Sequence, residues 1–288
     1  MTLTEHARAA LRERIERLDA QIGLALARCG EDEVHDFRVA VRRLGQALRI
    51  FADLLPGKEA KRMRRALKPA LDAAARVRDL DVDSELLARL GLRADHPLPG
   101  KMRADRERAA LGFTGQLYLL RSQGAPSDWM GRLEALRETE ADAAAHGRAL
   151  LPPMAAEFFA AGRKAAAKPS AAAQLHAFRL AAKRFRYTLE IYSGLYGPAL
   201  ERRLGQVREI QGILGRRQDC AVTARLLEAA ASFDPEAQRV MQALERRARK
   251  LEAEFARYWR ETFDGEGQER LWLRYLARRA PRAGGAAG

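Results

Sequence analysis

The sequence predicts an all-α protein made of two sequence-related helical bundles. Ala, Leu, Arg and Glu dominate its 288 residues, and the alternating Val, Ile and Thr runs that are typical of strands are almost absent. Gly- and Pro-containing turn signals lie far apart, which leaves long segments for about eight to ten helices. The expected breaks between helices lie at 29–30, 56–57, 96–100, 124–127, 151–153, 168–170, 197–198, 234–235 and 265–267.

The segments between these breaks carry helix-start signals. Asp32, Ser127 and Ser170 each precede a predicted helix and have side-chain oxygens that can cap free backbone N–H groups. At the other end of the chain, residues 281–288 are rich in Gly and Ala, and we expect them to be a disordered tail.

Composition indicates a folded protein with a strongly basic surface. Hydrophobic residues make up 47% of the chain and charged residues 31%, and the formal net charge is +14. A surface of this charge attracts polyanions or anionic membranes. The two cysteines, Cys29 and Cys220, are too few for a disulfide framework, and neither a signal peptide nor an apolar membrane-spanning segment is visible. These features predict a cytoplasmic protein without a membrane partner.

A tandem repeat organises the chain. Residues 34–51 (VHDFRVAVRRLGQALRIF) and 175–192 (LHAFRLAAKRFRYTLEIY) share seven identical residues at an offset of 141. The correspondence continues at an offset of 140, for example between Asp79 and Asp219. Two related halves of this kind are expected to pack about a pseudo-two-fold axis, as an intramolecular counterpart of an isologous dimer.

Each copy of the repeat predicts a helix with an apolar seam and a basic stripe beside it. The seams have heptad spacing, and the stripes lie one position further around each helix. The basic stripes contain His35, Arg38, Arg42 and Arg49 in the first copy and His176, Arg179, Lys183 and Arg186 in the second. Arg43 and Arg184 are duplicated as well but point away from the stripes.

The simplest interpretation is that these cations are only solvated helix faces and that the histidines are packed residues. However, cations at i,i+4 repel one another by a few tenths of a kcal/mol per pair, and few acidic residues lie between them. A duplicated, uncompensated row of cations favours an anionic ligand.

The motif His-x-x-Arg-x-x-x-[Arg/Lys]-Arg, present at 35–43 and at 176–184, resembles the CHAD domain, the conserved histidine α-helical domain. The segments 78–82 and 214–219 also resemble the helices that follow these motifs in the family. The resemblance implies a single domain over residues 1–280, with halves 1–145 and 146–280. It further implies non-catalytic binding of inorganic polyphosphate at a basic central surface, with association with polyphosphate granules in the cytoplasm.

The expected binding residues are those of the two stripes with Arg43 and Arg184. Lys68, Arg76, Arg208 and Arg216 form a second tier, because these positions are basic in both halves. Polyphosphate has no bases, so spaced Arg and Lys side chains are sufficient to bind it. Affinity should fall with salt, and protonation of the two histidines should strengthen binding below about pH 6.5. We expect no cofactor or metal, and the sequence leaves the protein partners unknown.

Two other functions compete with this hypothesis. The first is a helical metal-dependent phosphohydrolase using the His35-Asp36 pair, with His6, Asp79, Asp81 and Asp83 nearby in sequence. Asp36 is replaced by Ala177 in the second copy, and the surrounding arginines would oppose a divalent cation.

The second is a nucleic-acid-binding module. The charge suits it, but no zinc finger, recognition-helix motif or aromatic RNA-binding signature is present, so we expect any such binding to be non-specific. Nucleotide-binding and serine-hydrolase motifs are also missing from the sequence.

Overall fold

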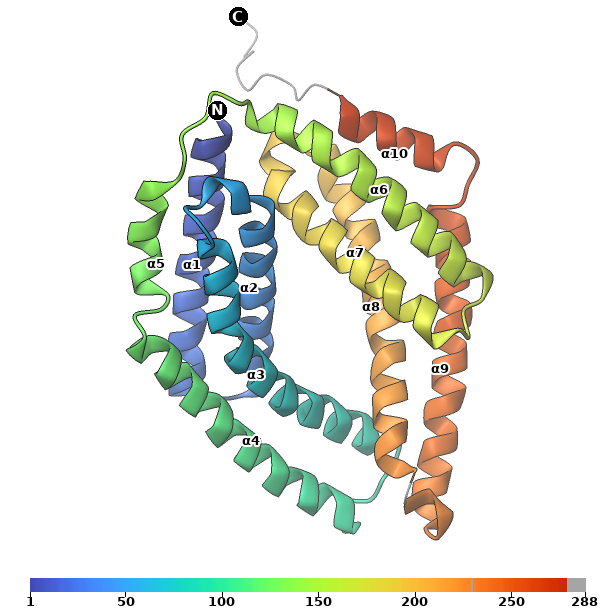
Figure 1. Cartoon of the computed structure of the whole chain (residues 1–288). Helices are drawn as coiled ribbons and strands as arrows, with labels where there is room; N and C mark the ends of the chain where they lie inside the picture. The colour runs from blue at the N-terminus through green and yellow to red at the C-terminus, as the bar shows by residue number, and fades with distance from the viewer. Residues whose placement is uncertain (229, 279–288) are drawn as a thin grey trace, which may run out of the picture. The chain divides into compact units, whose positions relative to one another are not determined.

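The computed structural model describes residues 1–228 and 230–278, and these residues form an all-α fold as predicted. The predicted tail at 281–288 lies outside the described residues. Within the described ranges there are ten α-helices and four short 3-10 helices (Figure 1). The elements are α1 (Leu3–Ala27), α2 (Glu31–Ile50), η1 (Ala52–Leu54), α3 (Glu59–Arg89), α4 (Pro97–Ser122), α5 (Ser127–Arg132), η2 (Leu133–Ala135), α6 (Ala143–Ala167), α7 (Ala172–Tyr192), η3 (Ser193–Leu195), α8 (Ala199–Leu227), η4 (Ala230–Ser232), α9 (Pro235–Thr262) and α10 (Gln268–Ala277).

The chain divides into two compact units. The N-terminal unit comprises Thr4–Thr139 together with Val222–Leu244. The C-terminal unit comprises Met1–Leu3, Glu140–Ala221 and the residues from Glu245 onward. Helices α8 and α9 are each continuous across the division, so the ends of these helices that adjoin η4 belong to the N-terminal unit.

The core of the N-terminal unit is built from the apolar faces of α1 to α4. The predicted seam of α2 is buried, with Phe37, Leu44 and Leu48 fully enclosed. The ring of Phe37 lies 5.1 Å from that of Phe113 on α4. Helix α3 packs against both the first basic helix, α2, and α4 (Figure 1).

An aromatic cluster forms the core of the C-terminal unit. Phe158 on α6 lies within 6 Å of the rings of Phe178, Phe185, Trp259 and Phe263. Helix α6 packs closely on α9 at Gly162, where a methyl group would overlap the Trp259 indole. The second basic helix, α7, therefore rests with its seam on a rigid aromatic core.

Most predicted breaks are confirmed, and glycines with left-handed backbone mark several of them, including Gly57, Gly124 and Gly197. The break at 151–153 is wrong, because α6 continues through Pro152 and Pro153. An interior proline costs a helix about 3 kcal/mol. The flanking residues Leu151 and Ala155 are completely buried, and this packing holds the helix together.

The predicted N-caps are also wrong. Helix α2 begins directly after Gly30, so Asp32 lies inside the helix and not at its N-cap position. No side chain caps α2, α5 or α7. No helix in the described part of the chain combines the length and apolar character needed to cross a bilayer.

Candidate anion-binding site

The basic stripe of α2 lies beside its buried seam, as the heptad pattern predicts. Val34, Phe37 and Val41 are buried, whereas His35 and Arg49 are exposed. Arg38, Arg42 and Arg43 are partly exposed. The seam anchors the helix, so the stripe presents cations from a fixed backbone.

His35 lies in a cluster of positive charge. Its pKa is lowered from the ordinary value of 6.5, first by desolvation and then by the charge of Arg78 on α3. Arg38 and Arg42 lower it further, and the adjacent Asp36 only partly offsets them. These effects disfavour the protonated imidazole, and a bound anion would favour it. We call His35, Arg38, Arg42 and Arg78 the His35 cluster.

Hydrogen bonds fix two of the three arginines of the His35 cluster in place. Arg38 Nη1 donates to the Ala74 carbonyl of α3 at 3.2 Å, and Arg78 pairs with Glu31 at the start of α2. A guanidinium has five N–H donors, so one bond to a carbonyl does not by itself prevent Arg38 from binding an anion. These contacts hold α2 and α3 in register, so residues from both helices surround His35.

Arg106 on α4 also binds α3 and the turn that precedes α2. Its Nε donates to Asp81 Oδ1 and its Nη2 to the Cys29 carbonyl, each at 2.9 Å. The Asp81 side chain is only 10% exposed, so this ion pair is largely shielded from water. Arg106 thereby ties α4 to α3 and to the turn before α2.

The second stripe, on α7, has the same pattern of burial. Leu175, Phe178 and Phe185 are buried, His176 is exposed, and Arg179 and Lys183 are partly exposed. The duplicated helices thus present their histidine and neighbouring cations at corresponding positions, each within its own unit.

Several predicted binding residues have carboxylate partners within the protein. Arg186 lies 3.6 Å from Glu190 and its guanidinium lies 4.7 Å from the Tyr187 ring centroid. Both side chains of this pair are largely buried, with exposures of 19% and 11%, so replacing Glu190 by a polyanion would be costly. The other pairs are exposed and worth about 0 to 1 kcal/mol each, so a polyanion could replace their carboxylates at small cost. They are Lys68–Asp72 at 2.5 Å, Arg184–Glu157 at 2.5 Å, Arg208–Glu201 at 2.6 Å and Arg216–Glu254 at 3.1 Å.

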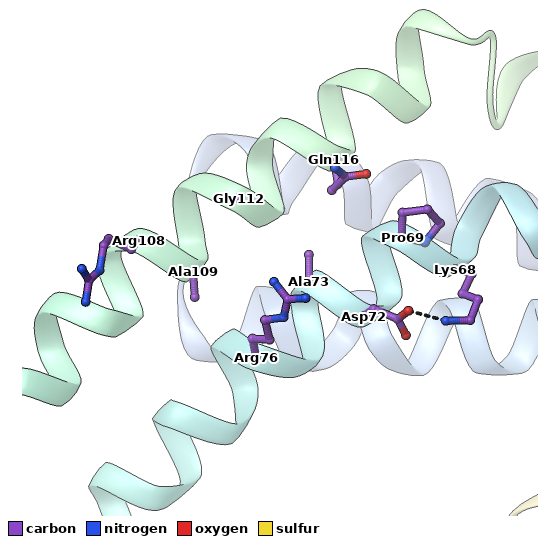
Figure 2. Close-up of a pocket in the computed structure, with 9 residues that line it drawn as sticks. All are labelled: Lys68, Pro69, Asp72, Ala73, Arg76, Arg108, Ala109, Gly112 and Gln116. Atoms are coloured by element: carbon purple, nitrogen blue, oxygen red, sulfur yellow. Dashed lines mark hydrogen bonds and ion pairs between the residues drawn. The ribbon is translucent and has the colours of Figure 1, made fainter.

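The remaining predicted residues divide between helix contacts and a separate pocket. Arg49 donates to its own helix, to the Gly45 carbonyl at 3.4 Å and to Gln46 Oε1 at 3.5 Å. Lys68 and Arg76 line a pocket between α3 and α4 (Figure 2). Arg78 was not predicted as a binding residue, because its position beside His35 depends on how α2 packs on α3.

The residues of the alternative phosphohydrolase site each contact a different partner. His6 is buried with its ring 5.9 Å from Phe51, Asp81 pairs with Arg106, and Asp83 accepts a hydrogen bond from Thr223 at 2.6 Å. Within residues 1–228 and 230–278 there is no group of three or more His, Cys, Asp or Glu side chains that could hold a metal ion. Asp81 and Asp83 are thus held in contacts within the fold.

The two isolated histidines of the sequence also have partners. His96 Nε2 lies 2.6 Å from Asp234 Oδ2, and this hydrogen bond is the main cause of a lowered Asp234 pKa. His146 Nδ1 lies 2.6 Å from the Tyr192 hydroxyl, and burial lowers the pKa of His146. Both histidines join segments that are distant in sequence.

Comparison with known proteins agrees with the helical pattern and the duplicated motif. The sequence matches the CHAD domain family over residues 9–228. The crystal structure of the CHAD domain from the plant Ricinus communis is similar, with 25% sequence identity and a TM-score of 0.62 over 98% of this chain and 94% of that chain. PptA from Streptomyces chartreusis shares the fold, with 19% identity and a TM-score of 0.67 over 90% of this chain and 100% of that chain. No curated protein matches the sequence. The chain belongs to the CHAD domain family.

Proposed function

We propose that the protein binds inorganic polyphosphate through the cations of α2 and α7, without hydrolysing it. The observation that carries this proposal is the His35 cluster, in which Arg38 and Arg42 of α2 and Arg78 of α3 gather around one histidine. Such a cluster is unfavourable by itself and favourable when an anion lies on it. His176, Arg179 and Lys183 occupy the positions of α7 that correspond to His35, Arg38 and Arg42.

The chemistry of these surfaces favours a ligand made of phosphate groups alone. Every aromatic side chain of α2 and α7 is buried, including Phe37, Phe178 and Tyr187. The basic stripes of these helices therefore offer no exposed Phe, Tyr or Trp ring on which a nucleic-acid base could stack, and the imidazoles of His35 and His176 are their only exposed rings. Arginine forks and a lysine suit the phosphates of a linear polyanion.

The absence of catalysis is part of the proposal. The groups that act on His35 are mainly cationic, and they would repel a divalent metal ion. Binding of an extended anion requires only spaced positive charges, and it needs neither a nucleophile nor a general base.

The test is a titration with long-chain polyphosphate that compares the wild type with the double variant Arg42→Ala/Lys183→Ala. We expect the variant to lose about 2 to 6 kcal/mol of binding free energy, because each cation makes charge-assisted contacts. Arg65→Ala/Arg246→Ala is the matched control, since it removes one exposed arginine from each half outside the stripes. Equal losses in both variants would show that binding depends on the total positive charge and not on the stripes.

Two further measurements complete the test. Short duplex DNA at the same phosphate concentration should not displace polyphosphate, and displacement would contradict selectivity for polyphosphate. No orthophosphate should be released from polyphosphate in the presence of manganese, and release that depends on His35 and Asp36 would support a phosphohydrolase instead.

Association with polyphosphate granules would follow from this binding. A fluorescent fusion of the full chain should colocalise with granules in cells that accumulate polyphosphate. The Arg42→Ala/Lys183→Ala variant should be diffuse, and granule localisation of that variant would show that another surface directs it.

A further inference from the structure

A pocket of about 440 Å³ opens between α3 and α4 in the N-terminal unit (Figure 2). Its volume lies within the range of small-molecule sites, roughly 300 to 1,000 Å³. The residues that line it are Lys68, Pro69, Asp72, Ala73 and Arg76 of α3 and Arg108, Ala109, Gly112 and Gln116 of α4.

The pocket combines cations with a small-residue wall. Ala73, Ala109 and Gly112 lie along the facing sides of the two helices between the arginines and Gln116 (Figure 2). A Cβ atom placed on Gly112 would meet no other atom within 4 Å, so the space in front of this glycine is open. A ligand can therefore approach the α4 backbone at this point.

The charges in the pocket differ in how they are compensated. Lys68 pairs with Asp72 at 2.5 Å, and Arg108 pairs with Asp105. Arg76 makes no hydrogen bond or ion pair to any residue within 1–228 and 230–278. Arg76 is thus the cation of the pocket that is best able to accept an anionic partner, and Arg108 can assist after a small rearrangement.

This pocket is distinct from the His35 cluster. Arg76 and Arg78 are two residues apart on α3, which places their side chains about 200° apart around the helix axis. Arg78 belongs to the side that faces His35 and α2, whereas Arg76 faces the pocket beside α4.

We propose that the α3/α4 pocket binds a small phosphate monoester that has a flat or apolar organic part. The phosphate would bind Arg76 and Arg108, and the organic part would lie on Ala73, Ala109 and Gly112 with Gln116 in hydrogen-bonding reach. Polyphosphate fits this pocket less well, because it has no apolar part to cover the small-residue wall. The proposal assigns Arg76, a second-tier polyphosphate residue in the sequence analysis, to this other ligand, and it does not require polyphosphate binding by α2 and α7.

The test uses phenyl phosphate and adenosine 5′-monophosphate as probes, with inorganic phosphate, phenol and adenosine as comparisons. Binding is followed by amide chemical shifts of the full chain and by calorimetry. We expect both esters to bind more tightly than any comparison and to shift the amides around Ala73 and Gly112. Equal binding of inorganic phosphate would remove the organic part of the proposal, and no binding of either ester would overturn it.

Variants locate the site. Gly112→Leu fills the open space without changing charge and raises helix propensity, so it should fold and weaken ester binding about tenfold or more. Gly115→Leu is the matched control, because Gly115 lies on the same helix, has no neighbour within 4 Å and does not line the pocket. Arg76→Gln should weaken ester binding by a similar factor. Unchanged ester binding in Gly112→Leu would overturn the proposal, whatever the result for polyphosphate.

Discussion

Thr223 donates a hydrogen bond from its hydroxyl to Oδ1 of Asp83 at 2.6 Å, and both side chains are buried. The two residues are 140 positions apart, which is the offset that aligns Asp79 with Asp219 and Val82 with Val222 in the repeat. The contact therefore joins equivalent positions of the two halves of the sequence. A buried carboxylate needs such a partner, because burying it without hydrogen bonds is costly.

Loss of this hydroxyl should destabilise the protein. Thr223→Val keeps the shape of the side chain but leaves the Asp83 carboxylate without this donor, so we expect the free energy of unfolding to fall by about 1 to 3 kcal/mol. Urea unfolding measures the change. Thr223→Ser, which keeps the hydroxyl, should lose less, and equal stability of the Val and Ser variants would contradict a role for the hydrogen bond.

Polyphosphate binding should depend on the protonation of His35. Nearby arginines and desolvation hold the pKa of this histidine below 6.5 in the free protein, and bound phosphate would raise it. Affinity should therefore increase as the pH falls through the interval between the bound and free pKa values. Titrations between about pH 5.5 and 8 check this, and the His35→Gln variant should show a weaker pH dependence. An equal pH dependence in both proteins would contradict the assignment.

His146 should make the protein less stable in acid. Its pKa is lowered by burial, so the folded state binds fewer protons than the unfolded state once the pH falls below the ordinary value of 6.5. The free energy of unfolding should therefore decrease as the pH drops below 6.5. Above pH 6.5 the histidine is neutral in both the folded and the unfolded state, so it should cause no further change in stability. Chemical denaturation of the wild type and His146→Gln at several pH values measures this dependence. In the His146→Gln variant, the free energy of unfolding should depend less steeply on pH.

The contact between α6 and α9 should not tolerate a larger residue at Gly162. A methyl group there overlaps the buried Trp259 indole, so Gly162→Ala should destabilise the protein by about 1 to 3 kcal/mol. Gly215→Ala on α8 is the control, because its Cβ has no neighbour within 4 Å. The control should be neutral or more stable, since alanine favours a helix by about 1 kcal/mol relative to glycine. Thermal unfolding of both variants separates the two effects.

The parts of the structure that follow from local periodicity could be predicted from the sequence. The seams of α2 and α7 are buried as the heptad spacing indicates, because one face of each helix must leave water. Turns at Gly57, Gly124 and Gly197 were also predictable, since their positive φ values suit glycine.

Contacts between distant segments could not be predicted in this way. Arg78 joins the His35 cluster only because α3 packs on α2, and Asp81 is shielded only because Arg106 reaches it from α4. The prolines at 152 and 153 signal a break locally, but the tertiary packing of α6 outweighs that signal. The α3/α4 pocket depends on two helices whose separation no single-segment pattern encodes.

The continuity of α8 and α9 across the two units has a consequence for how such a chain could be divided. A fragment ending at Thr139 would lack residues 222–244, and with them Thr223 and Asp234, the partners of Asp83 and His96. The first half of the duplication would then not be self-sufficient as a linear fragment, because residues 222–244 that complete its unit are encoded in the second half. In genetic terms, a gene split at the repeat boundary would yield a first product that needs part of the second to complete its fold.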